Sequence, residues 1–329
     1  MKYTSCSLIE HGLDFSQNSI NLCCRHTSES NKLKEIVSNY NGELLNTERF
    51  FALKRYHRKR MKEGNILPEC RGCIYLEEKE YDDEDYIDTI NFNHGNTCNC
   101  KCVYCPITIG EKSPSRYNVY DVIKHLADGG YIRKGGHISI AGGEPVIAPE
   151  FNDLLTLFLE LDLEPIRILT NSINYSDIIT KGVQKGNVNI LTSVDAGTPE
   201  MYRWIKGVDC FKFVWDNLKT YAENQSRPYL VKAKYLVIPT INDVKDEVLK
   251  FLDKAKECGL SYVTFDIEQF WFEENRNNIP NSLNKFLEFT VEETQKRGLV
   301  YDPIDRAVIL LKEINKTKNY DLEFRGNKV

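Results

Sequence analysis

The sequence predicts an α/β protein in which six β-strands alternate with amphipathic helices around a parallel sheet. Three observations support this prediction. The chain of 329 residues is long enough to bury a large core. Its content of 41% hydrophobic and 28% charged residues is ordinary for a globular protein. From about residue 86, short β-rich runs alternate with helical runs, which favours right-handed βαβ units; six such units would make a barrel, open or closed.

The expected strands are short apolar runs bounded by turn residues: DTINFN (88–93), HISIA (137–141), PIRILT (165–170), VNILTSV (188–194), YLVKAKYLVI (229–238) and YVTFDI (262–267). The segments between them carry apolar residues at helical spacing. We expect those helices at 116–130, 150–162, 175–186, 199–207, 211–224 and 243–259. The tail from Ser282 predicts one or two further helices packed on the outside.

The N-terminal part of the chain has a different pattern. Residues 1–85 show little alternation, several turn formers and five cysteines, which is typical of a small metal-braced module too poor in core to stand alone. The acidic run from Glu77 to Tyr86 predicts a solvated linker. We therefore expect a cysteine-containing module at 1–85, the barrel at 86–270 and a helical extension at 271–329.

Charge and hydropathy argue against two classes of partner. The net charge of -5 lacks the basic footprint of most nucleic-acid-binding domains. The one basic stretch, LKRYHRKRMK at 53–62, predicts a solvated helix face. The N-terminus has neither the basic start nor the apolar run of a signal peptide, and no segment is apolar enough to span a bilayer. We expect a cytoplasmic protein with no membrane partner.

The eleven cysteines form two groups and two isolated residues. In a reducing compartment they indicate metal ligation or thiol chemistry rather than disulfides. The densest group, TCNCKCVYCP at 97–106, follows the first expected strand. In parallel α/β proteins this is the carboxyl edge of the sheet, where ligands bind.

Three explanations fit this group. A zinc ribbon would pair Cys102 and Cys105 with the CxxC of Cys70 and Cys73, at an unusually long separation. The second explanation is a group of buried structural cysteines, for which a polar loop is a poor location. The third is an iron-sulfur cluster held by Cys98, Cys102 and Cys105, which leaves one iron of a four-iron cluster open to an external chelator and makes Cys100 a spare.

The stretch CNCKCVYC resembles the CxxxCxxC signature of the radical S-adenosylmethionine (radical SAM) superfamily, including the aromatic residue before the last cysteine. Four further matches follow in order on the expected strand ends: GGEP (142–145), TNS (170–172), SVDAGTPEMYRWIKG (193–207) and KYLVIPTIND (234–243). The resemblance covers roughly residues 86–270. It implies a partial (β/α)6 TIM-like barrel of parallel strands, with a small N-terminal metal-binding module and C-terminal helices.

The resemblance also implies a chemistry. A [4Fe-4S] cluster on Cys98, Cys102 and Cys105 would bind S-adenosylmethionine at its open iron. An external electron donor such as flavodoxin or ferredoxin would reduce it, and the 5'-deoxyadenosyl radical formed would abstract hydrogen from a substrate. The implied cofactor contacts are Tyr104, Gly142, Gly143, Glu144, Pro145, Asn171, Ser193 and Asp195.

Two of these residues have a local alternative. Asp195 would serve equally as a turn or N-cap residue before Thr198 and Pro199. Asn171 would serve equally as the side chain of an Asx turn.

The early cysteines resemble the auxiliary-cluster modules called twitch and SPASM domains. Cys6, Cys23, Cys70 and Cys73 would then hold a second [4Fe-4S] cluster, with Cys23 preferred over Cys24. In the family these modules usually follow the barrel, so the N-terminal position is a departure. Zinc on the same thiolates is the alternative.

The sequence leaves the substrate open. The favoured expectation is a peptide or protein, modified by crosslinking, oxidation or epimerisation; Cys210 would be the hydrogen-atom donor that epimerases of the family require. A carbohydrate or nucleoside-type small molecule is the alternative. An alternative of another class is a zinc-braced protein that binds nucleic acid through residues 53–62.

Overall fold

The computed structural model describes residues 2–17, 19–23, 46–71, 73, 75–105 and 118–315. It divides into two compact units. The first takes the described residues up to Thr97 and from Asn118 to Ile168, and the second takes Cys98–Cys105 and 169–315. Each unit is described by itself.

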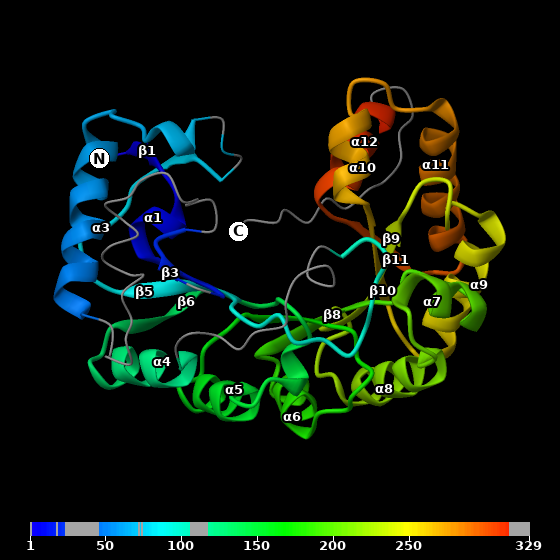
Figure 1. The fold of residues 1–329 in the computed structure, drawn as a ribbon, viewed down its shortest axis with the longest axis horizontal. Coiled ribbons are helices and arrows are strands. Elements are labelled where there is room, and N and C mark those ends of the chain that lie inside the picture. The colour runs from blue at the N-terminus through cyan, green and yellow to red at the C-terminus, as the bar shows by residue number, and fades with distance from the viewer. Residues whose placement is uncertain are drawn as a thin grey trace. The chain divides into compact units, whose positions relative to one another are not determined.

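The first unit is built on a mostly parallel sheet (Figure 1). Its strands follow the order β3-β2-β5-β6-β7, and the short β3 alone runs antiparallel to its neighbour. The strand bounds are β2 Gly12–Ser16, β3 Ile20–Asn21, β5 Ile87–Asn93, β6 Ile132–Ile140 and β7 Ile166–Thr170. Two amphipathic helices follow β5 and β6 in the chain, α4 Val119–Asp128 and α5 Phe151–Glu160. Their apolar faces are fully buried, so they cover the apolar side of the sheet.

The N-terminal elements of this unit form a second, smaller core. The short strand β1 (Tyr3–Ser5) pairs antiparallel with β4 (Glu77–Lys79). The remaining elements are α1 Ser7–His11, α3 Thr47–Lys62 and the short η1 Pro68–Cys70. Their apolar side chains pack with Cys6 and Cys70 into one buried cluster.

Helix α3 confirms the expected solvated face at residues 53–62 only in part, because Arg55, Lys59 and Lys62 are exposed but two other cations are not. Lys54 and Arg58 are buried, with 0% and 3% of their surface exposed. Arg58 pairs with the buried Glu10 at 3.0 Å, and the Lys54 ammonium donates to the carbonyl oxygens of Leu8 and Ile9. These cations lie inside because α3 packs against α1, which supplies their partners; the sequence pattern does not reveal those partners.

The second unit contains four parallel strands in the order β8-β9-β10-β11. Their bounds are β8 Val188–Ser193, β9 Val231–Val237, β10 Tyr262–Ile267 and β11 Val300–Pro303. The helices are α6 Asp177–Lys185, α7 Pro199–Lys206, α8 Phe211–Asn224, α9 Lys245–Glu257, α10 Gln269–Asn275, α11 Asn281–Lys296 and α12 Asp305–Asn315.

The six expected strands are present within a few residues of their expected bounds. Two additions differ from expectation. Strand β2 lies within residues 1–85 yet pairs in parallel with β5, and the tail contributes the strand β11 as well as helices. Among the described residues, we find no helix whose length and apolar character would let it cross a membrane.

Candidate functional site

The cysteine-rich loop, Cys98–Cys105, lies in the second unit and is fixed by the end of α7. Two backbone hydrogen bonds join them, from Lys101 N to Lys206 O at 2.8 Å and from Val103 N to Ile205 O at 3.0 Å. The loop backbone therefore has a defined path without regular secondary structure of its own. The backbone of the loop is thus held by main-chain hydrogen bonds to α7.

The four thiols of this loop differ in exposure. Cys98, Cys102 and Cys105 are half-buried, whereas Cys100 is 2% exposed. The Cys100 thiol hydrogen-bonds to Cys102 and Cys98, which together with burial raises the pKa of Cys100. The same Cys100 contact lowers the pKa of the Cys102 thiol to about 7, with help from the Lys206 ammonium. Three accessible thiols with one of them readily ionised fit an iron-sulfur cluster, because thiolates are the ligands.

Asn171 lies against this loop. Its amide nitrogen donates to Asn99 Oδ1 at 2.6 Å and to Cys100 Sγ at 3.4 Å. Its Oδ1 accepts from Ile173 N at 3.0 Å, which is the Asx turn considered from the sequence. The side chain thus supports the loop while shaping its own turn, and direct contact with the cofactor stays a prediction.

Asp195 is the centre of a buried polar network in the second unit. It is 0% exposed and adopts a left-handed backbone conformation, with φ of 63°. Its Oδ2 accepts from the Tyr104 hydroxyl at 2.6 Å and from the Lys206 ammonium. Its Oδ1 accepts from the backbone N–H of Leu236 at 2.8 Å. Both oxygens are engaged within the chain, so the carboxylate anchors Tyr104 of the cysteine-rich loop to β9.

The charges of this network balance one another. Burial opposes ionisation of the Asp195 carboxyl, but Lys206 and Lys234 outweigh it and hold its pKa below the usual range. Burial likewise opposes the Lys206 ammonium, and Asp195 outweighs it, so the pKa of Lys206 is raised. Lys206 also donates to the Tyr104 hydroxyl at 2.8 Å. At neutral pH the pair is ionised and keeps the loop in place.

Sequence reasoning missed Lys206 as a site residue. The signal was present, because Lys206 stands near the end of the quoted 193–207 motif. Asp195 is not the N-cap of α7. That residue is Thr198, whose side chain accepts from Met201 N at 3.3 Å. Ser193 ends β8, two residues before Asp195, and its cofactor role stays a prediction.

The GGEP segment lies in the first unit and packs against the backbone that precedes the cysteines. Glu144 N donates to Thr97 O at 2.8 Å. Gly142 and Gly143 have positive φ values of 80° and 34°, and a Cβ on Gly143 would fall 2.2 Å from Thr97 O. Only glycine permits this approach. The buried Glu144 carboxylate accepts from Val146 N at 3.3 Å and so caps η3 (Pro145–Ile147).

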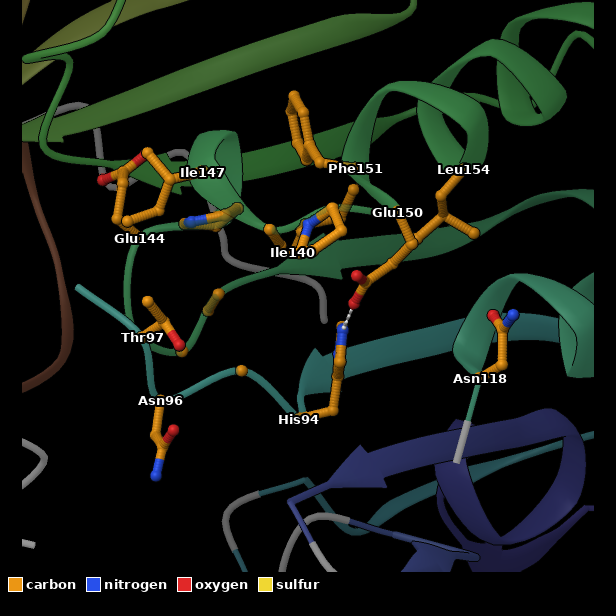
Figure 2. A pocket seen from close by; sticks show the side chains of 16 residues that line it. His94, Asn96, Thr97, Asn118, Ile140, Glu144, Ile147, Glu150, Phe151 and Leu154 are labelled. Atoms are coloured by element: carbon orange, nitrogen blue, oxygen red, sulfur yellow. Dashed lines mark hydrogen bonds and ion pairs between the residues drawn. The ribbon is translucent and has the colours of Figure 1, made fainter. Parts of the chain in front are cut away.

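A cavity of about 550 Å³ lies beside GGEP in the same unit (Figure 2). His94 and Glu150 meet in its wall, with Nε2 and Oε1 2.7 Å apart, and the contact with His94 lowers the pKa of Glu150. His94 is 6% exposed and its ring meets that of Phe92 edge to face. The pair therefore ties the end of β5 to the start of α5.

The early cysteines gather in the first unit. Cys6 and Cys70 belong to the buried cluster of the small core, and Cys23 packs against it. Cys73 N donates to Cys70 O at 2.9 Å. Burial raises the pKa of the Cys6 thiol, backbone hydrogen bonds from Ile9 and Leu8 lower it, and the charge of Cys73 raises it further. Cys24 lies outside the described residues.

Within the part of the chain that the structure describes, no three His, Cys, Asp or Glu side chains converge as a single metal ion requires. A four-iron cluster sets a different requirement, because each thiolate binds its own iron. Cys210 is the N-cap residue of α8 and half-buried, with its pKa raised by burial and by Asp209. Its role as a hydrogen-atom donor stays a prediction.

The fold is a mostly parallel α/β architecture, and its cysteine-rich loop carries three half-buried thiols at the CxxxCxxC spacing. The sequence profile of the radical SAM superfamily matches residues 92–254. Residues 92–254 form a radical SAM domain and the chain is a radical SAM enzyme, a family that uses a [4Fe-4S] cluster and S-adenosylmethionine.

The curated relatives include GTP 3',8-cyclases and molybdenum cofactor biosynthesis proteins. GTP 3',8-cyclase of Limosilactobacillus fermentum is 24% identical over 244 residues, 70% of this chain and 68% of that protein. Molybdenum cofactor biosynthesis protein 1 of Homo sapiens is 28% identical over 184 residues, 55% of this chain and 28% of that protein. The chain thus matches a minor part of the human relative.

Solved structures agree on the fold. SuiB of Streptococcus suis, bound to its precursor peptide SuiA, superposes with a TM-score of 0.52 and 13% identity, over 95% of this chain and 75% of that one. This likeness supports the mixed α/β architecture with its mostly parallel strands.

Proposed function

We propose that this radical SAM enzyme acts on a nucleotide or nucleoside-type small molecule. The observation that carries the proposal is that the curated relatives include GTP 3',8-cyclases from bacteria and archaea. The sequence favoured a peptide or protein substrate, with a small molecule as the alternative. The names of the relatives support the alternative.

The residues that would hold the cofactors are those of the cysteine-rich loop and GGEP. Cys98, Cys102 and Cys105 would bind three irons of a [4Fe-4S] cluster, and its fourth iron would take S-adenosylmethionine. The glycine backbone at 142–143 would admit the methionine part, since no side chain blocks it. Bound together, cluster and S-adenosylmethionine supply a radical that abstracts hydrogen from the substrate.

The chain's own contribution is positioning. Asp195 and Lys206 fix the Tyr104 side chain and through it the loop, in a buried environment where charged hydrogen bonds are strong. The end of α7 holds the loop backbone. Together these contacts keep in place three cysteines that are half-buried.

A second cluster on Cys6, Cys23, Cys70 and Cys73 is part of the proposal. The position of Cys6, Cys70 and Cys23 at one apolar core supports it, because a hydrophobic shell limits the access of water to a cluster. Zinc on the same residues is the alternative. Iron, sulfide and zinc analysis of anaerobically reconstituted protein separates them: about eight irons per chain are expected for two four-iron clusters, and about four irons with zinc for the alternative.

The substrate class is tested with deuterated nucleotides. The reconstituted enzyme is reduced with dithionite, or with a flavodoxin or ferredoxin system, in the presence of S-adenosylmethionine and ribose-deuterated GTP, ATP, CTP or UTP. We expect one of them to stimulate 5'-deoxyadenosine formation and to transfer deuterium to it. Stimulation by peptides and by none of the nucleotides would return the proposal to a peptide substrate.

A further inference from the structure

A row of polar side chains crosses the sheet of the first unit. Register places Asp14 of β2 beside Asn91 of β5, Asn91 beside Ser139 of β6, and Ser139 beside Arg167 of β7. Neighbours in a parallel register point to the same face. These four residues, here named the polar row, therefore share one face of the sheet.

The opposite face is the apolar core. Phe15 and Phe92, one residue further along β2 and β5, stack with ring centroids 4.9 Å apart, and Phe92 contacts Phe158 of α5 at 5.8 Å. The other alternate residues on these strands are buried and apolar: Leu13, Ile90, Ile138, Ile140, Ile166 and Ile168. Because the helix-covered face takes all of these, the polar row lies on the face turned away from α5.

One buried member of the polar row, Asp14, is incompletely paired among the described residues. Asp14 is 4% exposed, yet its Oδ1 has no hydrogen-bond partner and its Oδ2 meets Asn21 at 3.3 Å. Asn91 and Ser139 are half-buried, and among the described residues we find no hydrogen bond from their side chains, so the cost of an unpaired buried group applies to Asp14. Buried polar groups are normally paired, and each one left unpaired costs about 1–3 kcal/mol. Such a cost is common where a ligand completes the pairing.

The chemistry of the row changes from one end to the other. Arg167 carries a planar cation that suits phosphate or carboxylate, and its charge helps to lower the pKa of His137 on the same face. Ser139 and Asn91 each donate and accept. Asp14 ends the row with a buried carboxyl. At about 4.8 Å per strand spacing, the row spans roughly 14 Å.

We propose that the polar row binds the nucleotide substrate, with a phosphate on Arg167 and the base on Asn91 and Asp14. This inference rests on the proposed function and names the residues that recognise its substrate. An asparagine amide can pair with two neighbouring atoms of a purine edge. The phosphate then lies at the β7 end and the base at the β2 end.

The test compares binding of GTP and guanosine by calorimetry to the reconstituted enzyme and its variants. The unaltered enzyme should bind GTP at least about tenfold more tightly than guanosine, or ~1.4 kcal/mol. Arg167→Gln should remove that preference, and Arg167→Lys should keep part of it. Asn91→Ala should weaken both ligands alike. Arg133→Gln, on the exposed start of β6, is the matched control and should change neither.

The outcomes separate this inference from the proposed function. If the unaltered enzyme turns over a nucleotide but Arg167→Gln retains its preference for GTP, the polar row is not the recognition site. If Asn91→Ala binds both ligands unchanged, the assignment of the base fails. If the unaltered enzyme binds neither GTP nor guanosine, the assignment of the polar row to a guanine nucleotide fails, and the substrate class itself is wrong if no nucleotide stimulates 5'-deoxyadenosine formation. S-adenosylmethionine cleavage without substrate should persist in every variant and reports that each has folded with its cluster.

Discussion

The two cysteine-bearing regions of this protein are built in opposite ways. Among the early cysteines, Cys6 and Cys70 are buried in an apolar core with the ion pair between Glu10 and Arg58 nearby, and Cys23 and Cys73 are half-buried. The cysteine-rich loop is polar, its three candidate ligands are half-buried, and backbone bonds and one charged network hold it in place. The difference shows two ways to hold cysteines in place. A loop that must admit an external ligand is held by backbone hydrogen bonds and a buried charged network, whereas a buried site is held by the apolar side chains packed around it.

The largest expected effect comes from a substitution that removes a ligand of the cysteine-rich loop and leaves the early cysteines intact. Cys102→Ala should reduce S-adenosylmethionine cleavage at least about a hundredfold, because two thiolates do not retain the cluster. Iron or zinc at the early cysteines should be unaffected. The measurements are 5'-deoxyadenosine formation and metal content of the reconstituted protein.

Cys100→Ala is the matched control for this prediction. Cys100 is buried and is not one of the three candidate ligands, so its loss should leave cleavage within about threefold. Loss of the cluster in this variant, or normal cleavage in Cys102→Ala, would mean that the wrong three thiols were chosen.

The next effect compares the two buried charge pairs. Lys206→Met removes the cation paired with the buried Asp195, and Arg58→Met removes the cation paired with the buried Glu10; each should lower the free energy of unfolding by about 3–5 kcal/mol. Lys206→Met should also impair S-adenosylmethionine cleavage, since Tyr104 loses a partner. Urea unfolding and 5'-deoxyadenosine formation measure the two effects. Equal loss of cleavage in both variants at a temperature where both are folded would contradict the positioning role of Lys206.

A smaller effect concerns pH. Burial raises the pKa of Asp14 from 3.8 to about 6, outweighing its hydrogen bond with Asn21. A raised carboxyl pKa gives stability that is complete below the unfolded value and is lost as pH rises through the folded value. The total loss is roughly 3 kcal/mol.

Asp14→Asn removes this dependence while keeping the shape of the side chain. Its stability advantage over the unaltered protein should grow by roughly 1–2 kcal/mol from about pH 5 to about pH 7.5. Urea unfolding at several pH values measures it. An advantage that is constant with pH would show that the Asp14 carboxyl ionises normally in the folded protein.

The sequence was sufficient for the six strands and the order of the motifs, because both are local patterns. It was insufficient for the polar row, which exists only through the register of β2, β5, β6 and β7. Strand β2 was missed because a five-residue strand among turn formers has no distinct periodicity. The burial of Lys54 and Arg58 was missed because their partners lie more than forty residues away.

The smallest expected effect tests whether the end of α7 holds the cysteine-rich loop in place. Gly207 ends α7 with φ of 68°, and a Cβ there would fall 2.9 Å from the Lys101 Cβ. Gly186 ends α6 with φ of 92°, where the nearest atom is the Ser226 hydroxyl at 3.1 Å. Each alanine substitution should lower the free energy of unfolding by about 1–2 kcal/mol, the cost of a left-handed residue. Only Gly207→Ala displaces the cysteine-rich loop, so only it should slow S-adenosylmethionine cleavage. Equal cleavage by the two variants would show that the loop does not depend on the end of α7.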